Sequence, residues 1–164
     1  MLAYDPGATA GYDLPLTVMS LIIAAVLTGA GLAIALQGSS RWMPVIGGAV
    51  VGVGIAAMHF TGMLALQIAG HITWSAGLVF SALVLGCAFG ALALTVAAKS
   101  DDLAHTLFSA FLLAIAIVSL HFTAMAAITF VPDPTVVADT ISVSPASLSL
   151  IISASATIIL GMCL

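Results

Sequence analysis

The sequence predicts an all-α protein, a polytopic transmembrane bundle of about five helices built from a two-helix repeat. Hydrophobic residues make up 63% of the 164 residues and charged residues only 5%, and the mean hydropathy is +1.33. Soluble globular domains do not have this balance. Two further observations, long uncharged runs and a repeated histidine motif, define the expected helices and their grouping.

The expected helices follow from runs without a charged residue, which extend over residues 14–40, 42–98, 103–132 and 140–164. A bilayer core of about 30 Å needs about 20 helical residues, so each run holds one span and the second run holds two. We therefore expect helices near residues 15–37, 43–69, 75–98, 104–130 and 145–164. Turn-forming residues and nearly all the charges lie between them, and the lipid bilayer is the expected partner.

The two basic residues predict an orientation. Arg41 and Lys99 fall in the first and third connections, which share one side of the membrane if the helices alternate. The positive-inside tendency assigns that side to the cytoplasm, so the turn at His71 and the loop over residues 131–144 are expected outside. Two basic residues also give no support for nucleic-acid binding.

A repeat groups the helices into pairs. The tripeptide His-Phe-Thr begins at His59 and again 62 residues later at His121, and the methionine four residues on recurs at the same interval, Met63 to Met125. Met1 lies a further 62 residues before Met63, in the place of a motif's last turn. A fixed period indicates a duplicated unit, and units with an even number of spans keep the same orientation.

This period divides the chain into a single membrane domain, residues 1–164, with units of about 1–63 and 64–125 and a partial unit 126–164. All motifs are then expected near the outer face. The unit that ends at Met1 lacks its histidine, so we expect either a fragment whose sequence begins late, at an internal methionine, or the loss of an ancestral first unit.

The motif residues have the chemistry of a copper site. Residues four apart share a helix face, so each histidine and its methionine form a ridge of one imidazole and one thioether. Imidazole and thioether together suit copper, and Cu(I) favours the thioether most strongly. If the second and fourth helices pack side by side, the metal ligands are His59, Met63, His121 and Met125, with Met58 as a further candidate.

A structural role is the alternative interpretation of these residues. An intramembrane histidine can bond a neighbouring threonine or carbonyl, and methionines are commonly packing residues. His71 could have an accessory role in its turn, whereas His105, beside two aspartates, is typical of a solvated helix start. Gly48 and Gly52 have the spacing that lets membrane helices approach closely. The chain has no nucleophile triad, phosphate-binding loop or HExxH motif, so we do not expect an enzyme.

The two motifs resemble the MHYT domain of bacterial integral membrane sensors. Met58 to Met63 reads MHFTGM and Leu120 to Met125 reads LHFTAM. Phe60 and Phe122 replace the family's tyrosine, and Leu120 replaces the first methionine, so the metal shell is not symmetrical. The family pattern has three motifs, and this chain has two with the tail of a third.

The resemblance implies a signalling sensor in the bacterial cytoplasmic (inner) membrane that binds copper and senses a diatomic gas (oxygen, carbon monoxide or nitric oxide) or redox state. It also implies an output partner outside this chain, such as a diguanylate cyclase, a phosphodiesterase or a histidine kinase. Three alternatives stay open at this point: a haem-binding bundle with His59 and His121 as axial ligands, a copper transport path, and a purely structural membrane anchor.

Overall fold

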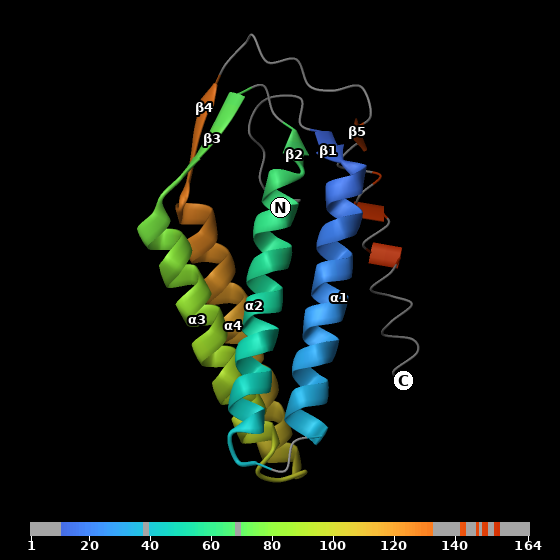
Figure 1. The fold of residues 1–164 in the computed structure, drawn as a ribbon, viewed down its shortest axis with the longest axis vertical. Helices are drawn as coiled ribbons and strands as arrows, with labels where there is room; N and C mark the ends of the chain where they lie inside the picture. Colours follow the sequence, from blue (N-terminus) through green and yellow to red (C-terminus); the bar gives the residue numbers. More distant parts are fainter. Residues whose placement is uncertain are drawn as a thin grey trace.

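The chain folds into a bundle of long antiparallel helices with short strands gathered at one end (Figure 1). The computed structural model describes residues 11–37, 40–67, 70–132 and 142–143, together with Ser147, Ser149, Leu150, Ser153 and Ala154. The helices are α1 (Leu14–Gln37), α2 (Met43–Leu64), α3 (Ala76–Ala97) and α4 (Leu103–Ala126). The strands are β1 (Gly11–Asp13), β2 (Leu66–Gln67), β3 (Gly70–Trp74), β4 (Ile128–Pro132) and β5 (Ser142–Val143).

The predicted fold class is confirmed. Within the described residues, four helices are long and apolar enough to cross a membrane, rather than five. Most of the fifth expected helix, residues 145–164, lies outside the described residues, and those of its residues that the structure describes are helical. Large apolar side chains cover the outer surface of the helices, as expected where the solvent is lipid.

The ends predicted for the second and fourth helices, residues 69 and 130, were wrong. These helices end at Leu64 and Ala126, and the chain continues as strands β2 and β4. The segment 70–74, expected as a turn, is strand β3. The physical reason is local composition together with a distant partner: His-Ile-Thr-Trp and Ile-Thr-Phe-Val are rich in β-branched and aromatic residues, and the two segments pair with each other.

The strands pair in two sheets whose registers are related by the 62-residue period. Tyr12 pairs with Leu66 in the sheet of order β2-β1-β5, and Trp74 pairs with Ile128 in the sheet of β3 and β4. Two equivalent backbone hydrogen bonds extend this match. The amide of Asp13 donates to the carbonyl of Ala65 at 2.8 Å, and the amide of Ser75 donates to that of Ala127 at 2.9 Å.

The helix pairs α1–α2 and α3–α4 are therefore two copies of one structural unit. The crossing within each pair also matches. A Cβ atom on Gly31 would lie 2.6 Å from the carbonyl oxygen of Gly47, so these backbones touch. At the equivalent place in the second pair, Ser109 donates its hydroxyl to the carbonyl of Ala93 at 3.0 Å.

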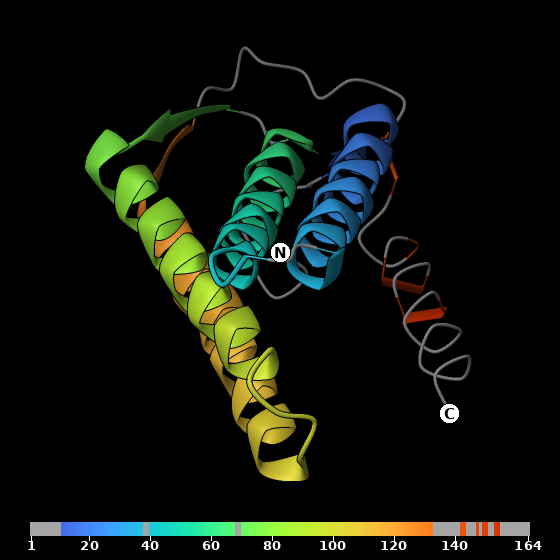
Figure 2. The same ribbon diagram turned by 60° about the horizontal axis from the view of Figure 1, so that its bottom comes forward.

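The two units meet along a seam of glycines between α2 and α3. A Cβ atom on Gly52 would lie 2.5 Å from the carbonyl oxygen of Gly86, and one on Gly90 would lie 2.5 Å from that of Gly48. Small residues four apart on both helices let the backbones approach closely, in the manner predicted for Gly48 and Gly52. Figure 2 shows the α1–α2 pair crossing the α3–α4 pair at an angle.

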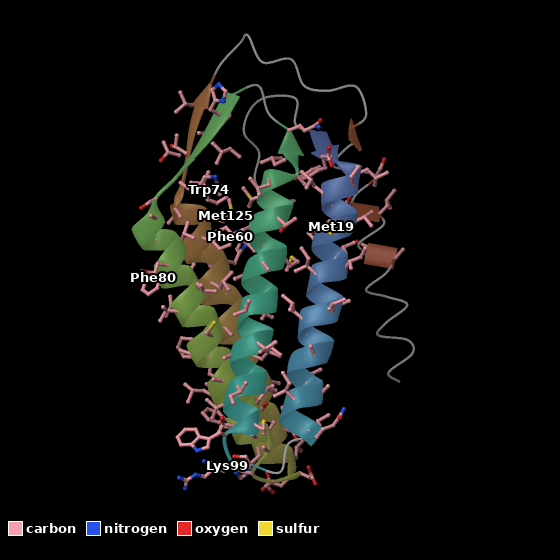
Figure 3. The ribbon with its side chains drawn as sticks, viewed as in Figure 1. Met19, Phe60, Trp74, Phe80, Lys99 and Met125 are labelled. Carbon is pink, nitrogen blue, oxygen red and sulfur yellow. The ribbon has the colours of Figure 1, made fainter. Side chains whose placement is uncertain are left out.

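The end of the bundle opposite the strands carries the basic residues. The α1–α2 and α3–α4 connections are both at this end, and Figure 3 labels Lys99 there. The guanidinium carbon of Arg41 lies 5.4 Å from the centre of the Trp42 ring, a cation–π contact. Both basic residues thus lie on one side, as their positions in the sequence predict.

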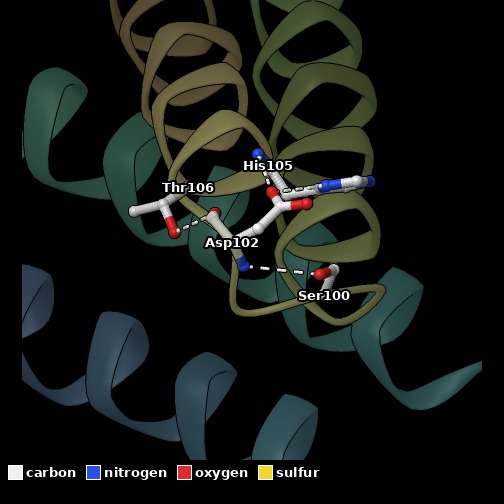
Figure 4. A network of polar contacts seen from close by, with 4 residues as sticks. All are labelled: Ser100, Asp102, His105 and Thr106. Atoms are coloured by element: carbon white, nitrogen blue, oxygen red, sulfur yellow. Dashed lines mark hydrogen bonds and ion pairs between the residues drawn. The ribbon is translucent and has the colours of Figure 1, made fainter.

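The start of α4 is capped by Asp102, and Figure 4 shows this polar network. The Asp102 carboxylate accepts the His105 backbone N–H at 2.7 Å and also lies 2.7 Å from His105 Nδ1. Thr106 donates its hydroxyl to the Asp102 carbonyl at 3.0 Å. Hydrogen bonds from His105 hold the pKa of the Asp102 carboxyl below its usual value. The bond from the His105 backbone N–H has the largest effect, and the bond from the His105 ring has the next largest. His105 therefore belongs to a helix start, as predicted.

Candidate functional site

The two motif histidines meet near the strand end of the bundle. His59 lies in the last two turns of α2 and His121 in the last two turns of α4. Their ring centres are 5.1 Å apart and the rings are nearly perpendicular, at 87°. The sequence predicts this meeting on the condition that the second and fourth helices pack side by side, and the structure places the imidazoles in edge-to-face contact.

His59 is the more enclosed of the two. Its side chain is only 6% exposed, and its Nε2 atom has no hydrogen-bond partner in the part of the chain that the structure describes. A buried polar atom without a partner costs free energy, and such atoms are rare in folded proteins. An unpartnered ring nitrogen beside a second imidazole is the kind of atom that can act as a metal ligand.

The methionines lie one turn beyond the histidines. Met63 is 2% exposed, whereas Met125 is half-buried. Figure 3 shows Met125 on α4 at the same level as Phe60 and Trp74. The helical spacing therefore puts one thioether near each imidazole, at the same depth in the bundle.

Leu120, the departure from the motif, has a packing role in the structure. It is 1% exposed and belongs to a core cluster with Ala56, Ala82 and Ala124. A Cβ atom on Gly86 would lie 2.5 Å from the Leu120 Cδ1 atom, so this leucine fills the space that the glycine leaves on α3. Met58 is the equivalent residue in the first unit, where α1 takes the place of α3.

A row of ring contacts runs from His59 through Phe60 to Trp74 of the second unit. The sequence did not predict these contacts. The Phe60 ring lies 5.5 Å from the His59 ring and 5.6 Å from the Trp74 ring, in both cases edge to face. In the sequence, a tryptophan at the end of a predicted span is typical of the membrane–water boundary and does not indicate this contact. The 62-residue period could have indicated its role, because it makes Trp74 the equivalent of Tyr12, which is buried at the start of the first unit. Burial also raises the pKa of the Tyr12 phenol.

The other histidines lie apart from this pair. His71 is exposed on β3, opposite Val131 of β4, and His105 lies at the other end of the bundle. Among the described residues, no group of three or more histidine, cysteine, aspartate or glutamate side chains could hold a metal ion. A metal at the His59–His121 pair would therefore need the methionine sulfurs or a ligand from outside these residues.

One protein family matches most of this chain. The MHYT family, described as the bacterial signalling protein N terminal repeat, matches residues 1–48 and 52–110. An uncharacterised signalling protein of Caulobacter vibrioides is 36% identical over 162 residues, which is 98% of this chain. No solved structure matches it significantly.

Two further relatives come from Pseudomonas aeruginosa. The bifunctional diguanylate cyclase/cyclic di-GMP phosphodiesterase MucR is 35% identical over 79% of this chain, and the cyclic di-GMP phosphodiesterase NbdA is 32% identical over 78%. The matched part is 20% of the Caulobacter protein and of MucR and 17% of NbdA, so the chain spans about a fifth of its relatives' length. Together with the paired motifs and the membrane-length helices, these matches show that the chain belongs to the MHYT family of bacterial signalling sensor domains.

Proposed function

We propose that this sensor domain binds one copper ion between its two units, with His59 and His121 as the nitrogen ligands. The observation that carries the proposal is the contact of the two imidazoles, 5.1 Å between ring centres, with a buried and unpartnered Nε2 on His59. A metal–nitrogen bond is about 2 Å long, so two imidazoles on one ion bring their ring centres within about 6 Å of each other.

Met63 and Met125 are the proposed sulfur ligands. With two imidazoles they make a soft donor set that favours Cu(I) over harder ions. Met63 is almost fully buried, so its thioether is held in one place by packing. Met58 ranks last among the five candidates, because its equivalent Leu120 packs towards the first helix of its own unit.

The haem and transport alternatives have less support. Two imidazoles in direct edge-to-face contact leave no gap for a porphyrin between them. A transport path would need ligands further along the bundle, where the α2–α3 seam is closed by contacts between the backbones of Gly48, Gly52, Gly86 and Gly90. A structural anchor would give the His59 Nε2 atom a hydrogen-bond partner, and none lies within the described residues.

Copper, when bound, would supply a one-electron redox change or a site at which a diatomic gas could replace one of the thioether ligands. The protein's own residues would convert that event into a change of packing. His59 belongs to the first unit and His121 to the second, so both side chains hold the two units together at the strand end. Ligation that pulls the imidazoles together or releases them would bias the arrangement of the units.

The proposed setting is the bacterial inner membrane, with the histidine pair towards the periplasm. Arg41 and Lys99 lie at the opposite end of the bundle, the end that the positive-inside tendency assigns to the cytoplasm. The signal would pass to an output outside this chain. The names of MucR and NbdA favour cyclic di-GMP synthesis or breakdown as that output, with a histidine kinase as the other candidate.

The deciding experiment measures copper in the protein purified in mild detergent, after copper has been offered under reducing conditions. We expect about one copper per chain by elemental analysis and no Soret band in the visible spectrum. The variant His59→Ala/His121→Ala should lose this copper. His105→Ala is the matched control, because His105 lies at the other end of the bundle, and it should retain the metal.

Two outcomes would contradict the proposal: a wild-type protein without copper, or a double variant that retains it. Gas sensing is tested separately on the Cu(I)-loaded protein by infrared spectroscopy under carbon monoxide. A carbonyl band that disappears in the double variant supports binding of the gas to copper at the histidine pair. A copper-loaded protein whose spectrum does not change with carbon monoxide, nitric oxide or oxygen would rule out gas sensing at this site.

A further inference from the structure

A groove of about 520 Å³ lies between α2 and α3, near the strand end of the bundle. Its walls come from the last turns of α2, the end of β3 and the first turns of α3, and include Phe60, Leu64, Trp74, Val79, Phe80 and Leu83. This volume is within the range of about 300–1,000 Å³ that is typical of small-molecule sites. Nothing in the proposed copper chemistry uses this groove.

The groove exists because a strand of the second unit brings Trp74 over the last turns of α2. Trp74 stands edge to face with Phe60, which separates the groove from His59. The equivalent of Phe60 in the second unit, Phe122, is 68% exposed, and the described residues give it no such neighbour. Because Phe60 belongs to the first unit and Trp74 to the second, the groove lies at the junction between the units.

The lining excludes ligands that carry polar groups into the groove. No charged side chain lines it, and almost all of its surface is carbon. A ligand with buried carbonyl or hydroxyl groups would leave them without hydrogen bonds, which is unfavourable in such surroundings. Hydrocarbon is the ligand chemistry that this lining fits.

The position of the groove indicates where that hydrocarbon comes from. Leu64 and Phe80 at its rim are 61% and 66% exposed, and the groove is continuous with the lipid-facing surface of two membrane-length helices. Trp74 closes the end nearest the strands, and tryptophan is typical of the membrane–water boundary. A lipid chain can therefore enter from the bilayer while its headgroup stays at the boundary.

We propose that this groove binds one acyl chain of a bilayer phospholipid. The chain lies against Phe60, Val79 and Leu83, with Trp74 between it and the strand end. The site does not depend on the proposed copper centre. Its occupant does, however, pack on the same phenylalanine that touches His59.

The test uses the two tryptophans, which lie at opposite ends of the bundle, since Trp42 precedes α2 and Trp74 ends β3. Trp42→Phe leaves Trp74 as the only tryptophan, and Trp74→Phe leaves Trp42, which is 59% exposed; excitation is selective for tryptophan over the two tyrosines. Each variant is placed in phosphatidylcholine vesicles in which a varied fraction of the lipid carries bromine at mid-chain, a contact quencher. A single bound chain predicts that Trp74 fluorescence falls in direct proportion to that fraction. Trp42, in contact with several chains, should show a steeper dependence.

Filling the groove should abolish this behaviour. In the Trp42→Phe background, Val79→Phe places a ring in the groove and should cause a loss of Trp74 quenching. Val84→Phe is the matched control, because Val84 lies on the same helix, is 47% exposed and does not line the groove, and it should leave the quenching unchanged. Unchanged quenching in a helical, membrane-inserted Val79→Phe protein would overturn the proposal.

A measurement without groove variants keeps the proposal falsifiable if Val79→Phe does not fold. Native mass spectrometry of the wild-type protein released from micelles should show one retained phospholipid per chain. Bare chains together with an unquenched Trp74 would show that lipid does not occupy the groove. A retained polypeptide in its place would assign the groove to a protein partner and would also overturn the proposal.

Discussion

The imidazole of His59 is a buried polar group whose Nε2 atom lacks a hydrogen-bond partner among the described residues. Removing such a group from the metal-free protein should therefore not destabilise it. We expect His59→Leu to leave the free energy of unfolding unchanged or to raise it by about 1–3 kcal/mol, the penalty of an unsatisfied buried group. Unfolding of the metal-free protein in mixed micelles measures this. A clear loss of stability would show that His59 is a structural residue.

A substitution at Met63 can likewise distinguish a packing role from a role as a metal ligand. Methionine and leucine have similar volumes, and exchanges of this kind in a core usually cost less than about 1.5 kcal/mol. Met63→Leu should therefore keep the fold and weaken Cu(I) binding, because the thioether sulfur is lost. Competition with a Cu(I) chelator of known affinity measures the change. An unaltered affinity would remove Met63 from the ligand set.

Part of the site could be predicted at the level of single residues. The spacing of the repeat brought His59 and His121 together correctly, because equivalent positions on equivalent helices lie at the same depth. The contact of Phe60 with Trp74 could not be predicted, since it depends on where strand β3 crosses the end of α2. The packing role of Leu120 likewise depends on the absence of a side chain at Gly86.

At the scale of the elements, the α2–α3 seam predicts a sensitivity to added methyl groups. A Cβ atom on Gly52 would meet the backbone of Gly86, which cannot move aside without separating the helices. We expect Gly52→Ala to destabilise the protein by about 1–3 kcal/mol, the usual effect of overpacking, and to weaken copper binding by moving α2 relative to α4. Gly29→Ala is the control, because a Cβ atom there would have no neighbour within 4 Å. Equal free energies of unfolding for the two variants in micelles would contradict the close backbone packing at the α2–α3 seam.

The start of α4 predicts a pH dependence outside the membrane. Hydrogen bonds that the Asp102 carboxylate accepts from His105 lower the folded-state pKa of Asp102 below the ordinary value of 3.8. A depressed pKa means that the carboxylate's stabilising contribution is complete above that ordinary value and is lost as the pH falls through the folded-state pKa. The protection of the amides of residues 103–106 against hydrogen exchange, measured relative to the intrinsic exchange rate at each pH, should therefore fall at such pH values. In Asp102→Ala, exchange should be faster at neutral pH and should lack this acidic transition.

The helix boundaries show what the sequence could and could not predict about the elements. The start of α2 at Met43 follows from the charge at Arg41 and from Pro44, which is favourable in a first helical turn. The ends of α2 and α4 were placed too late, because the apolar composition continues into β2 and β4. Hydropathy does not separate an apolar strand from an apolar helix, and each strand's partner is more than fifty residues away.

At the scale of the whole molecule, the proposed orientation can be tested in intact cells. In a background without Cys87 and Cys163, a cysteine at Thr73 lies on the strand end and a cysteine at Ser40 lies on the basic end, and both positions are exposed. A thiol reagent that does not cross the inner membrane should label Thr73→Cys and should not label Ser40→Cys. The reverse pattern would place the histidine pair towards the cytoplasm.

The strand pairing has a mechanical consequence for the whole bundle. At one end of each helix pair, the strands pair and the Asp13–Ala65 and Ser75–Ala127 backbone hydrogen bonds form. At the other end a short loop connects the helices. The two helices of a pair are therefore held together at both ends. The two helix pairs touch along the backbones of the glycine seam. Under the proposed copper function, a change in the spacing of His59 and His121 on one side of the seam would turn one helix pair against the other. The loops at Arg41 and Lys99, on the other side of the seam, would then move as well.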